Sequence, residues 1–143
     1  MKSPLSIVIG RFLLGSYFFV PGITKFTQQG DMIVYMQANG VPMALPLLWF
    51  AGVASLIGGL MLMSGRYVKI AAYGFVIYIL LVNFMMHDFW NMGEDRVPRE
   101  LQNFIKNLGI MAGLLVLGGF SSWRLPRREG WWRSDAQLSS DSN

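Results

Sequence analysis

The hydrophobic and polar positions of the chain form long apolar stretches separated by short polar connections. Four of these stretches approach the roughly 20 residues that an α-helix needs to cross the hydrocarbon core of a bilayer. They are residues 5–24, 45–64, 68–86 and 104–122, and none contains more than one charged residue. The pattern predicts an all-α integral membrane protein in which the four helices form one bundle.

The connection after the first stretch has a helical pattern of its own. Within residues 28–39, apolar side chains occupy positions 32, 33, 35 and 36, which is roughly helical spacing. Gly40 and Pro42 follow, and they end the pattern because glycine tolerates a positive φ and proline cannot continue a helix. We therefore expect a short interfacial helix after the first span.

Composition supports a membrane location and narrows the chemistry. Of the 143 residues, 53% are hydrophobic and only 14% are charged, whereas about 25% of the residues of a soluble domain are charged. The chain has no cysteine, which excludes disulfides, thiol catalysis, iron–sulfur clusters and zinc sites built on cysteine. The length fits one domain, so we expect a four-helix domain over residues 1–123 and a basic, tryptophan-containing tail over residues 124–143.

Basic residues are unevenly shared between the two sides of the predicted bundle. With four spans, the N-terminus, the middle connection and the tail share a side that carries seven of them: Lys2, Arg66, Lys69, Arg124, Arg127, Arg128 and Arg133. The other side carries four: Lys25, Arg96, Arg99 and Lys106. Because basic residues accumulate on the cytoplasmic side of membrane proteins, we expect both termini to be cytoplasmic.

Two polar residues, Arg11 and Ser55, lie inside the predicted spans. Arg11 is about six residues into its span, roughly 9 Å deep at 1.5 Å per residue. A charge inside the bilayer is costly, and two arrangements would reduce the cost. The side chain either extends back to the cytoplasmic surface or turns inward to a polar partner such as Ser55 or Tyr73.

A second group of polar and aromatic residues lies at the outer ends of the predicted spans. Its members are Lys25, Asn83, His87, Asp88, Phe89, Trp90, Lys106 and Asn107. Asn83 and His87 are four residues apart and share a helix face, with Trp90 three residues further on. Ordinary anchoring of tryptophan and lysine at the interface would explain part of the group. Asn83 is the exception, because an amide inside a span needs a partner from another helix.

The same group also fits a functional interpretation. A histidine can change charge near neutral pH, lysines are charged hydrogen-bond donors, and aromatic rings form flat walls. A membrane quinone headgroup needs donors to its carbonyl oxygens, an aromatic wall and a proton carrier. A lone histidine is too little for a metal or haem site, so we expect no metal and no covalently bound cofactor. Any redox role would then depend on a quinone or on a partner subunit.

Several motifs of the chain resemble the DoxX family of small bacterial four-helix membrane proteins. The first span contains GRFLLG at residues 10–15 and FFVPGITKF at residues 18–26, similar to the family's Arg-x-x-x-Gly and Gly-x-x-Lys pattern. Further matches are AG at residues 51–52, GGLML at 58–62 with Gly65, HDFW at 87–90 and FIKNL at 104–108. Their order and spacing, more than any one of them, carry the resemblance.

The resemblance implies a bacterial inner-membrane protein linked to redox biology, since the family takes its name from a subunit of a thiosulfate:quinone oxidoreductase. On this basis we expect a redox-associated accessory subunit or a quinone-interacting component of an oxidoreductase, with its polar site in the outer leaflet. The alternative is a non-catalytic module that stabilises a larger membrane complex. In either case we expect a homo-oligomer or a subunit of a larger complex, and no nucleic-acid partner.

One position departs from the family's pattern. The family usually has a glutamate in the second span before the Gly-Gly pair, and this chain has Ser55 there. If that glutamate neutralises the first-span arginine in relatives, Arg11 here depends on neutral partners or on the surface.

Overall fold

The computed structural model describes residues 4–124 and 132–140, and the regular structure in these residues is helical. The helices are α1 (Leu5–Thr27), α2 (Gln29–Ala38), α3 (Ala44–Ser64), α4 (Val68–Met86), α5 (Val97–Phe120) and α6 (Asp135–Ser140), with a short 3-10 helix, η1 (Phe89–Asn91). Within the described ranges, four helices are long and apolar enough to cross a membrane. The prediction of an all-α protein with four spans is confirmed.

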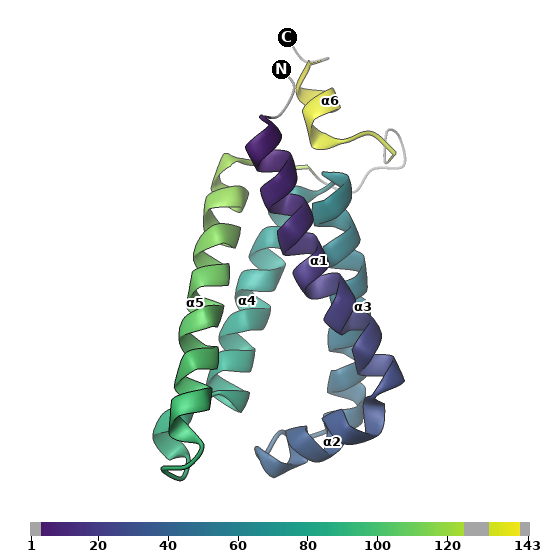
Figure 1. Cartoon of the computed structure of the whole chain (residues 1–143). Coiled ribbons are helices and arrows are strands. Elements are labelled where there is room, and N and C mark those ends of the chain that lie inside the picture. Colours follow the sequence, from purple (N-terminus) through teal and green to yellow (C-terminus); the bar gives the residue numbers. More distant parts are fainter. Residues whose placement is uncertain (1–3, 125–131, 141–143) are drawn as a thin grey trace.

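The four long helices form two pairs that lie side by side (Figure 1). Helix α1 packs along α3, α4 packs along α5, and contacts between α3 and α4 join the pairs. The start of α1, the α3–α4 connection and the end of α5 lie at one end of the bundle, which we call the terminal end. Helix α2 and η1 lie at the other end, the distal end, where Arg96 Nη2 donates a hydrogen bond to Asn39 Oδ1 at 3.3 Å.

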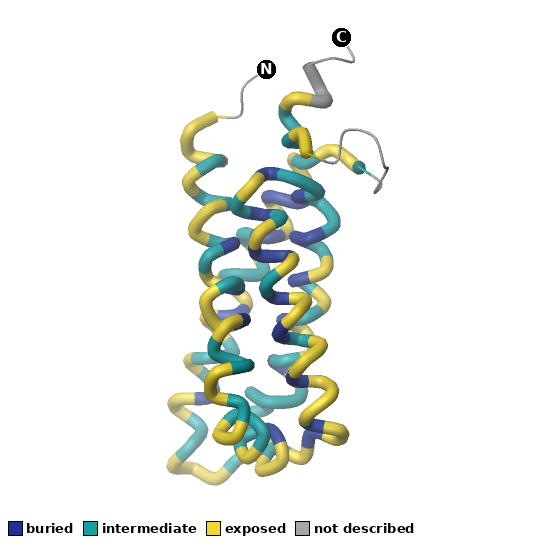
Figure 2. The backbone as a smooth tube through the Cα atoms, turned by 90° about the vertical axis from the view of Figure 1, so that its right-hand side faces the viewer, coloured by how far each residue is buried: buried dark blue, intermediate teal, exposed yellow. Residues whose placement is uncertain are grey.

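The outward faces of the bundle are apolar. Figure 2 shows exposed residues along the outer side of the helices and buried residues between them. Large side chains such as Phe50 and Phe120 are 74% and 87% exposed, which suits contact with lipid but not with water. Helix α2 occupies most of the predicted segment 28–39. Its location at a membrane surface stays a prediction.

The fourth span begins seven residues before the predicted start at residue 104, because α5 starts at Val97. Residues 97–103 include Arg99, Glu100 and Asn103 and therefore do not read as an apolar stretch. They are nevertheless helical, since Pro98 lies in the first turn, where its missing N–H costs nothing, and Glu100 suits the positive end of the helix dipole. This extension brings Glu100 into the bundle.

The apolar core is divided into two clusters. The larger one lies in the terminal half, where the Phe18 ring of α1 stacks on Phe75 of α4 with centroids 3.8 Å apart. The smaller one, Met36, Val41, Ala44 and Leu48, packs α2 against the start of α3. The part of the distal half between the helix pairs is lined by polar side chains, described below.

Helices α1 and α3 approach closely at two glycines. A Cβ atom added at Gly15 would lie 2.7 Å from the Gly59 carbonyl oxygen and 2.6 Å from Met63 Cγ. A Cβ atom added at Gly59 would lie 2.8 Å from the Gly15 carbonyl oxygen. Small residues allow this close packing, which favours association of helices in lipid.

Arg11 lies at the terminal end and does not pair with Ser55 or Tyr73. Its guanidinium occupies the space where a Cβ atom of Gly65, the C-cap of α3, would stand. Ser55 is ten residues earlier on α3, roughly 15 Å away along the helix, and the Tyr73 ring stacks on Trp123. The guanidinium therefore lies against the α3–α4 connection, and Arg11 Nε is buried there without a hydrogen-bond partner among the described residues.

Part of the predicted tail folds back onto the α3–α4 connection. Asp135, the first residue of α6, accepts hydrogen bonds from the backbone N–H groups of Tyr67 and Val68 at 3.0 and 2.9 Å. These N–H groups open α4 and have no partner within that helix. Arg124 pairs with the Asp135 carboxylate at 3.3 Å and stands 4.4 Å above the Tyr67 ring. Trp131 and the basic residues 127 and 128 of the predicted tail lie outside the described residues.

Substitution of Gly15 tests the close helix contact. We expect Gly15→Ala to lower the free energy of unfolding by about 1–3 kcal/mol, because the added methyl group meets backbone that cannot move aside. Gly10→Ala is the matched control on the same helix, since nothing lies within 4 Å of its added Cβ atom. Unfolding of both variants in micelles measures the difference, and equal stability would show that α1 and α3 are not held this closely.

Substitution of Asp135 tests the contact of α6 with α4. We expect Asp135→Ala to destabilise the start of α4 by about 1 kcal/mol, the usual cost of losing a helix cap. Amide hydrogen exchange at Tyr67 and Val68 should accelerate, while exchange in the distal half of α4 should stay unchanged. Unaltered exchange at both amides would mean that Asp135 does not cap the helix.

Candidate functional site

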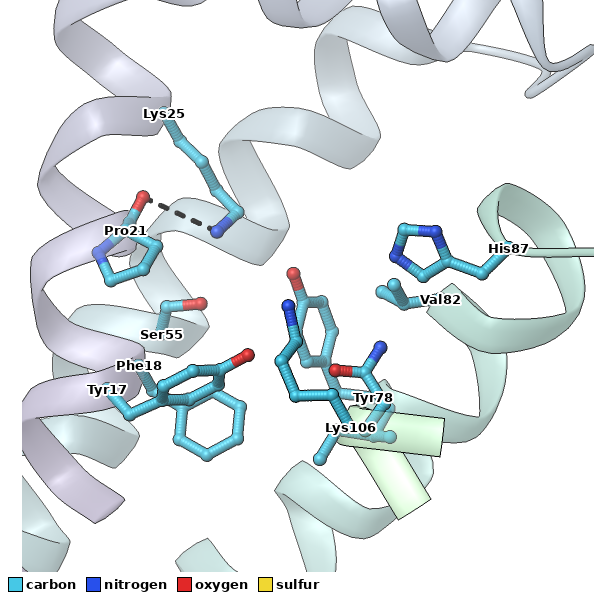
Figure 3. A pocket seen from close by; sticks show the side chains of 11 residues that line it. Tyr17, Phe18, Pro21, Lys25, Ser55, Tyr78, Val82, His87 and Lys106 are labelled. Carbon is cyan, nitrogen blue, oxygen red and sulfur yellow. Dashed lines mark hydrogen bonds between the residues drawn. The ribbon is translucent and has the colours of Figure 1, made fainter. Parts of the chain in front are cut away.

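A cavity of about 200 Å³ lies in the distal half of the bundle, between the four spans. It is lined by Tyr17, Phe18, Pro21, Lys25, Ser55, Tyr78, Ile79, Val82, His87, Lys106 and Asn107. Figure 3 shows the polar ends of the tyrosine, serine, lysine and histidine side chains directed toward one space. Polar groups from α1, α3, α4 and α5 are thus concentrated in one place inside an apolar bundle.

Lys25 reaches the cavity from the last turn of α1. Its ammonium group donates a hydrogen bond to the Pro21 carbonyl oxygen at 3.4 Å and stands 5.9 Å from the centroid of the Tyr78 ring. Both neighbours are uncharged, and Figure 3 shows the ammonium group curled back toward Pro21. The Lys25 ammonium group is therefore a hydrogen-bond donor at the wall of the cavity without a carboxylate partner among the described residues.

Lys106 reaches the same cavity from α5. Its residue is exposed, so it stands where the cavity opens, and its ammonium group donates to Asn103 Oδ1 at 3.3 Å. Figure 3 shows the Lys106 side chain and the Tyr78 hydroxyl both directed into the cavity. Together, Lys25 and Lys106 present two positive charges to one small space.

His87 is held by Glu100, which is buried with 1% of its surface exposed. His87 Nδ1 lies 2.7 Å from Glu100 Oε2, and Asn103 Nδ2 donates to the same oxygen at 3.2 Å. The contact places a proton on Nδ1 and leaves Nε2 on the cavity side of the ring (Figure 3). The second carboxylate oxygen accepts a bond from Arg99, whose side chain is 68% exposed. Glu100 thus fixes the orientation of the His87 ring.

The negative charge of Glu100 influences Tyr35 of α2. Burial raises the pKa of the Tyr35 phenol, and the nearby Glu100 carboxylate raises it further, while Arg96 and Arg99 act in the opposite direction. Tyr35 of α2 and the charged residues at the start of α5 therefore interact electrostatically.

Asn83 and Asn107 are paired with each other. Asn107 Nδ2 donates to Asn83 Oδ1 at 2.7 Å, and Asn83 Nδ2 donates to the Phe104 carbonyl oxygen at 3.4 Å. Asn83 is 1% exposed and does not line the cavity, whereas Asn107 does. The expectation that Asn83 needs a partner from another helix is confirmed, and its contact joins α4 to α5.

Asp88, Phe89 and Trp90 do not line the cavity, so the structure does not bring their side chains to the site with His87. Helix α4 ends at Met86 and the chain turns into η1, so the helical spacing from His87 to Trp90 does not apply. Asp88 accepts a bond from Asn91 at 3.0 Å. The two aromatic residues pack with Phe84 and Phe104 on the outside, where Trp90 is 50% exposed.

Seven residues of the cavity lining were not part of the group expected from the sequence: Tyr17, Phe18, Pro21, Ser55, Tyr78, Ile79 and Val82. Glu100, which holds His87, was also not expected. The two tyrosines lie inside spans and count as apolar in a hydropathy pattern. Ser55 was expected only as a polar residue within its span, and it is buried against the cavity. Glu100, Asn103 and Asn107 have the spacing of one helix face. That spacing would have identified Glu100 if the fourth helix had been extended toward the N-terminus.

Comparison with known proteins places this bundle in a family. The family model described as DoxX matches residues 6–88. The chain belongs to the DoxX family. It is also 26% identical over 114 residues to the inner membrane protein YphA of Escherichia coli (strain K12), an alignment that covers 80% of this chain and 81% of that protein. No solved structure matches the chain significantly.

The family match covers only part of the cavity. The matched residues 6–88 include the lining residues from α1, α3 and α4 and His87, but they end before α5. Glu100, Lys106 and Asn107 therefore come from outside the matched region. With four apolar helices and an inner-membrane relative, this DoxX protein is a multi-pass protein of the inner membrane.

Removal of the buried carboxylate tests the His87 contact in this DoxX protein. We expect Glu100→Ala to lower the free energy of unfolding by about 2 kcal/mol, because it removes charge-assisted hydrogen bonds from a buried site. Glu94→Ala, which removes an exposed carboxylate, should have little effect. A double-mutant cycle with His87→Ala measures the coupling of the pair, and a coupling energy near zero would contradict the contact.

Proposed function

We propose that this protein binds the headgroup of a membrane quinone in the cavity and acts as an accessory subunit of a redox complex. The observation that carries the proposal is the convergence of Lys25, Lys106 and His87 on one ring-sized cavity inside apolar helices. These side chains supply hydrogen-bond donors and a group that exchanges protons. A quinone dissolved in the bilayer needs both.

The size and walls of the cavity suit a substituted six-membered ring. Apolar cavities of about 150 Å³ bind benzene in other proteins, and this cavity measures about 200 Å³. The rings of Tyr17, Phe18 and Tyr78 form part of its wall. Flat aromatic surfaces favour stacked or edge-on contact with another ring.

The polar groups match the two carbonyl oxygens of a quinone. The ammonium groups of Lys25 and Lys106 are charged donors, and such hydrogen bonds are about twice as strong as neutral ones. Reduction of a quinone to the quinol takes two electrons and two protons. His87, backed by Glu100, is placed to give a proton to a ring oxygen and to regain one. The electrons would come from a partner protein, which is why we assign an accessory role.

We also propose that the termini are cytoplasmic and that the cavity lies in the outer leaflet. The support is the charge distribution, with seven basic residues on the side of the termini against four on the other. This bias is the usual determinant of orientation in multi-pass proteins. The cavity in the distal half would then receive quinone from the outer part of the membrane.

Binding of a short-chain ubiquinone to the purified protein in lipid nanodiscs tests the function. We expect saturable binding, and we expect His87→Ala to weaken it about tenfold, the equivalent of one hydrogen bond to a charged group. Equilibrium titration followed by tryptophan fluorescence or calorimetry gives both affinities.

The control variant is Trp90→Phe, which changes the aromatic group outside the cavity and should leave the affinity unchanged. Equal affinity of the wild type and His87→Ala would remove His87 from the site. Absence of saturable binding to the wild type would refute the proposed function.

A further inference from the structure

We propose that the cavity selects a ring ligand that carries a negative charge on a ring oxygen, such as a deprotonated hydroxyquinone, over a neutral quinone of the same shape. This inference rests on the proposed function, because it names the form of the ring that the same cavity prefers. The juxtaposition that carries it is Lys25 and Lys106 facing one cavity with no carboxylate in its lining.

The two lysines have only neutral hydrogen-bond partners. Lys25 Nζ bonds to the Pro21 carbonyl oxygen and Lys106 Nζ bonds to Asn103 Oδ1. The ion pairs among the described residues are His87–Glu100, Arg99–Glu100 and Arg124–Asp135, and none of them involves either lysine. The positive charges at the cavity are therefore not balanced by the part of the chain that the structure describes.

Glu100 contacts the lining residue His87, but its carboxylate already has other hydrogen-bond partners. Its oxygens accept bonds from His87, Asn103 and Arg99. It also lies behind His87, which lines the cavity while Glu100 does not. The Glu100 carboxylate is paired with the Arg99 guanidinium, and these two charges offset each other beside the lining. The lining as a whole is positive.

An anionic ring would relieve this imbalance. The half-buried Lys25 loses part of its hydration, and an opposite charge at contact distance interacts more strongly there than in water. A neutral quinone offers only carbonyl acceptors, whereas a ring with an ionised oxygen offers the same acceptors together with the missing charge. The aromatic walls and the volume of about 200 Å³ favour a flat ring over a phospholipid headgroup with its acyl chains.

The test compares two rings of nearly the same size and different charge. The anionic probe is 2-hydroxy-1,4-naphthoquinone, which is ionised at neutral pH, and the neutral probe is 2-methyl-1,4-naphthoquinone. Both are titrated against the full chain in phosphatidylcholine nanodiscs. We expect the wild type to bind the anionic probe about tenfold more tightly than the neutral one, as suits a charge-assisted contact in a partly buried site.

The variants assign the preference to the lysines. Lys25→Met and Lys106→Met should each lose most of the preference while still binding the neutral probe, and Lys25→Arg and Lys106→Arg should restore much of it. Lys69→Met is the matched control, because Lys69 lies at the terminal end over Trp123. Circular dichroism verifies that each variant is folded.

The outcomes separate this inference from the proposed function. Equal binding of both probes by the wild type would overturn charge selection and leave ring binding intact. Binding of neither probe would overturn both proposals. Loss of the anionic preference when phosphatidylglycerol replaces part of the phosphatidylcholine would show that lipid headgroups take the positive charges, and would also overturn the inference.

Discussion

Buried polar groups in an apolar bundle must satisfy one another, and this constraint determines how α4 and α5 pack. The hydrocarbon core of a bilayer supplies no water to replace a missing partner. The paired amides of Asn83 and Asn107 join the two helices, and the contact between Glu100 and His87 fixes the turn between them. His87 directly follows the last residue of α4, and its contact with Glu100 holds the ring at the cavity.

The two ends of the bundle use their charges differently. At the terminal end, Asp135 and Arg124 neutralise each other and cap the start of α4, and Arg11 reaches the helix end beside Gly65. At the distal end, Lys25 and Lys106 have no carboxylate within ion-pair distance among the described residues. The first arrangement stabilises the fold. The second leaves charge available for a ligand, which is why the site is assigned to the distal half.

The sequence predicted the four spans, the short helix after the first and the convergence of Lys25, His87, Lys106 and Asn107, because hydropathy and helical spacing are local properties. It did not predict that Glu100 is buried, since Arg99, Glu100 and Asn103 interrupt the apolar pattern of residues 97–103 and the predicted span therefore began after them. It placed Trp90 wrongly, because the turn after Met86 depends on how α4 packs. Tyr17 and Tyr78 were missed because a sequence does not show whether the hydroxyl of a tyrosine within a span faces a cavity.

The neighbouring residues Lys106 and Asn107 both line the cavity, but only Asn107 also joins α5 to another helix. Asn107 is buried in a hydrogen bond with α4, whereas Lys106 stands at the opening of the cavity and forms no bond to another helix among the described residues. The charge at position 106 can therefore be changed while the amide contact between α4 and α5 is kept. Charge at the cavity opening and cohesion of the bundle are separable properties of neighbouring residues.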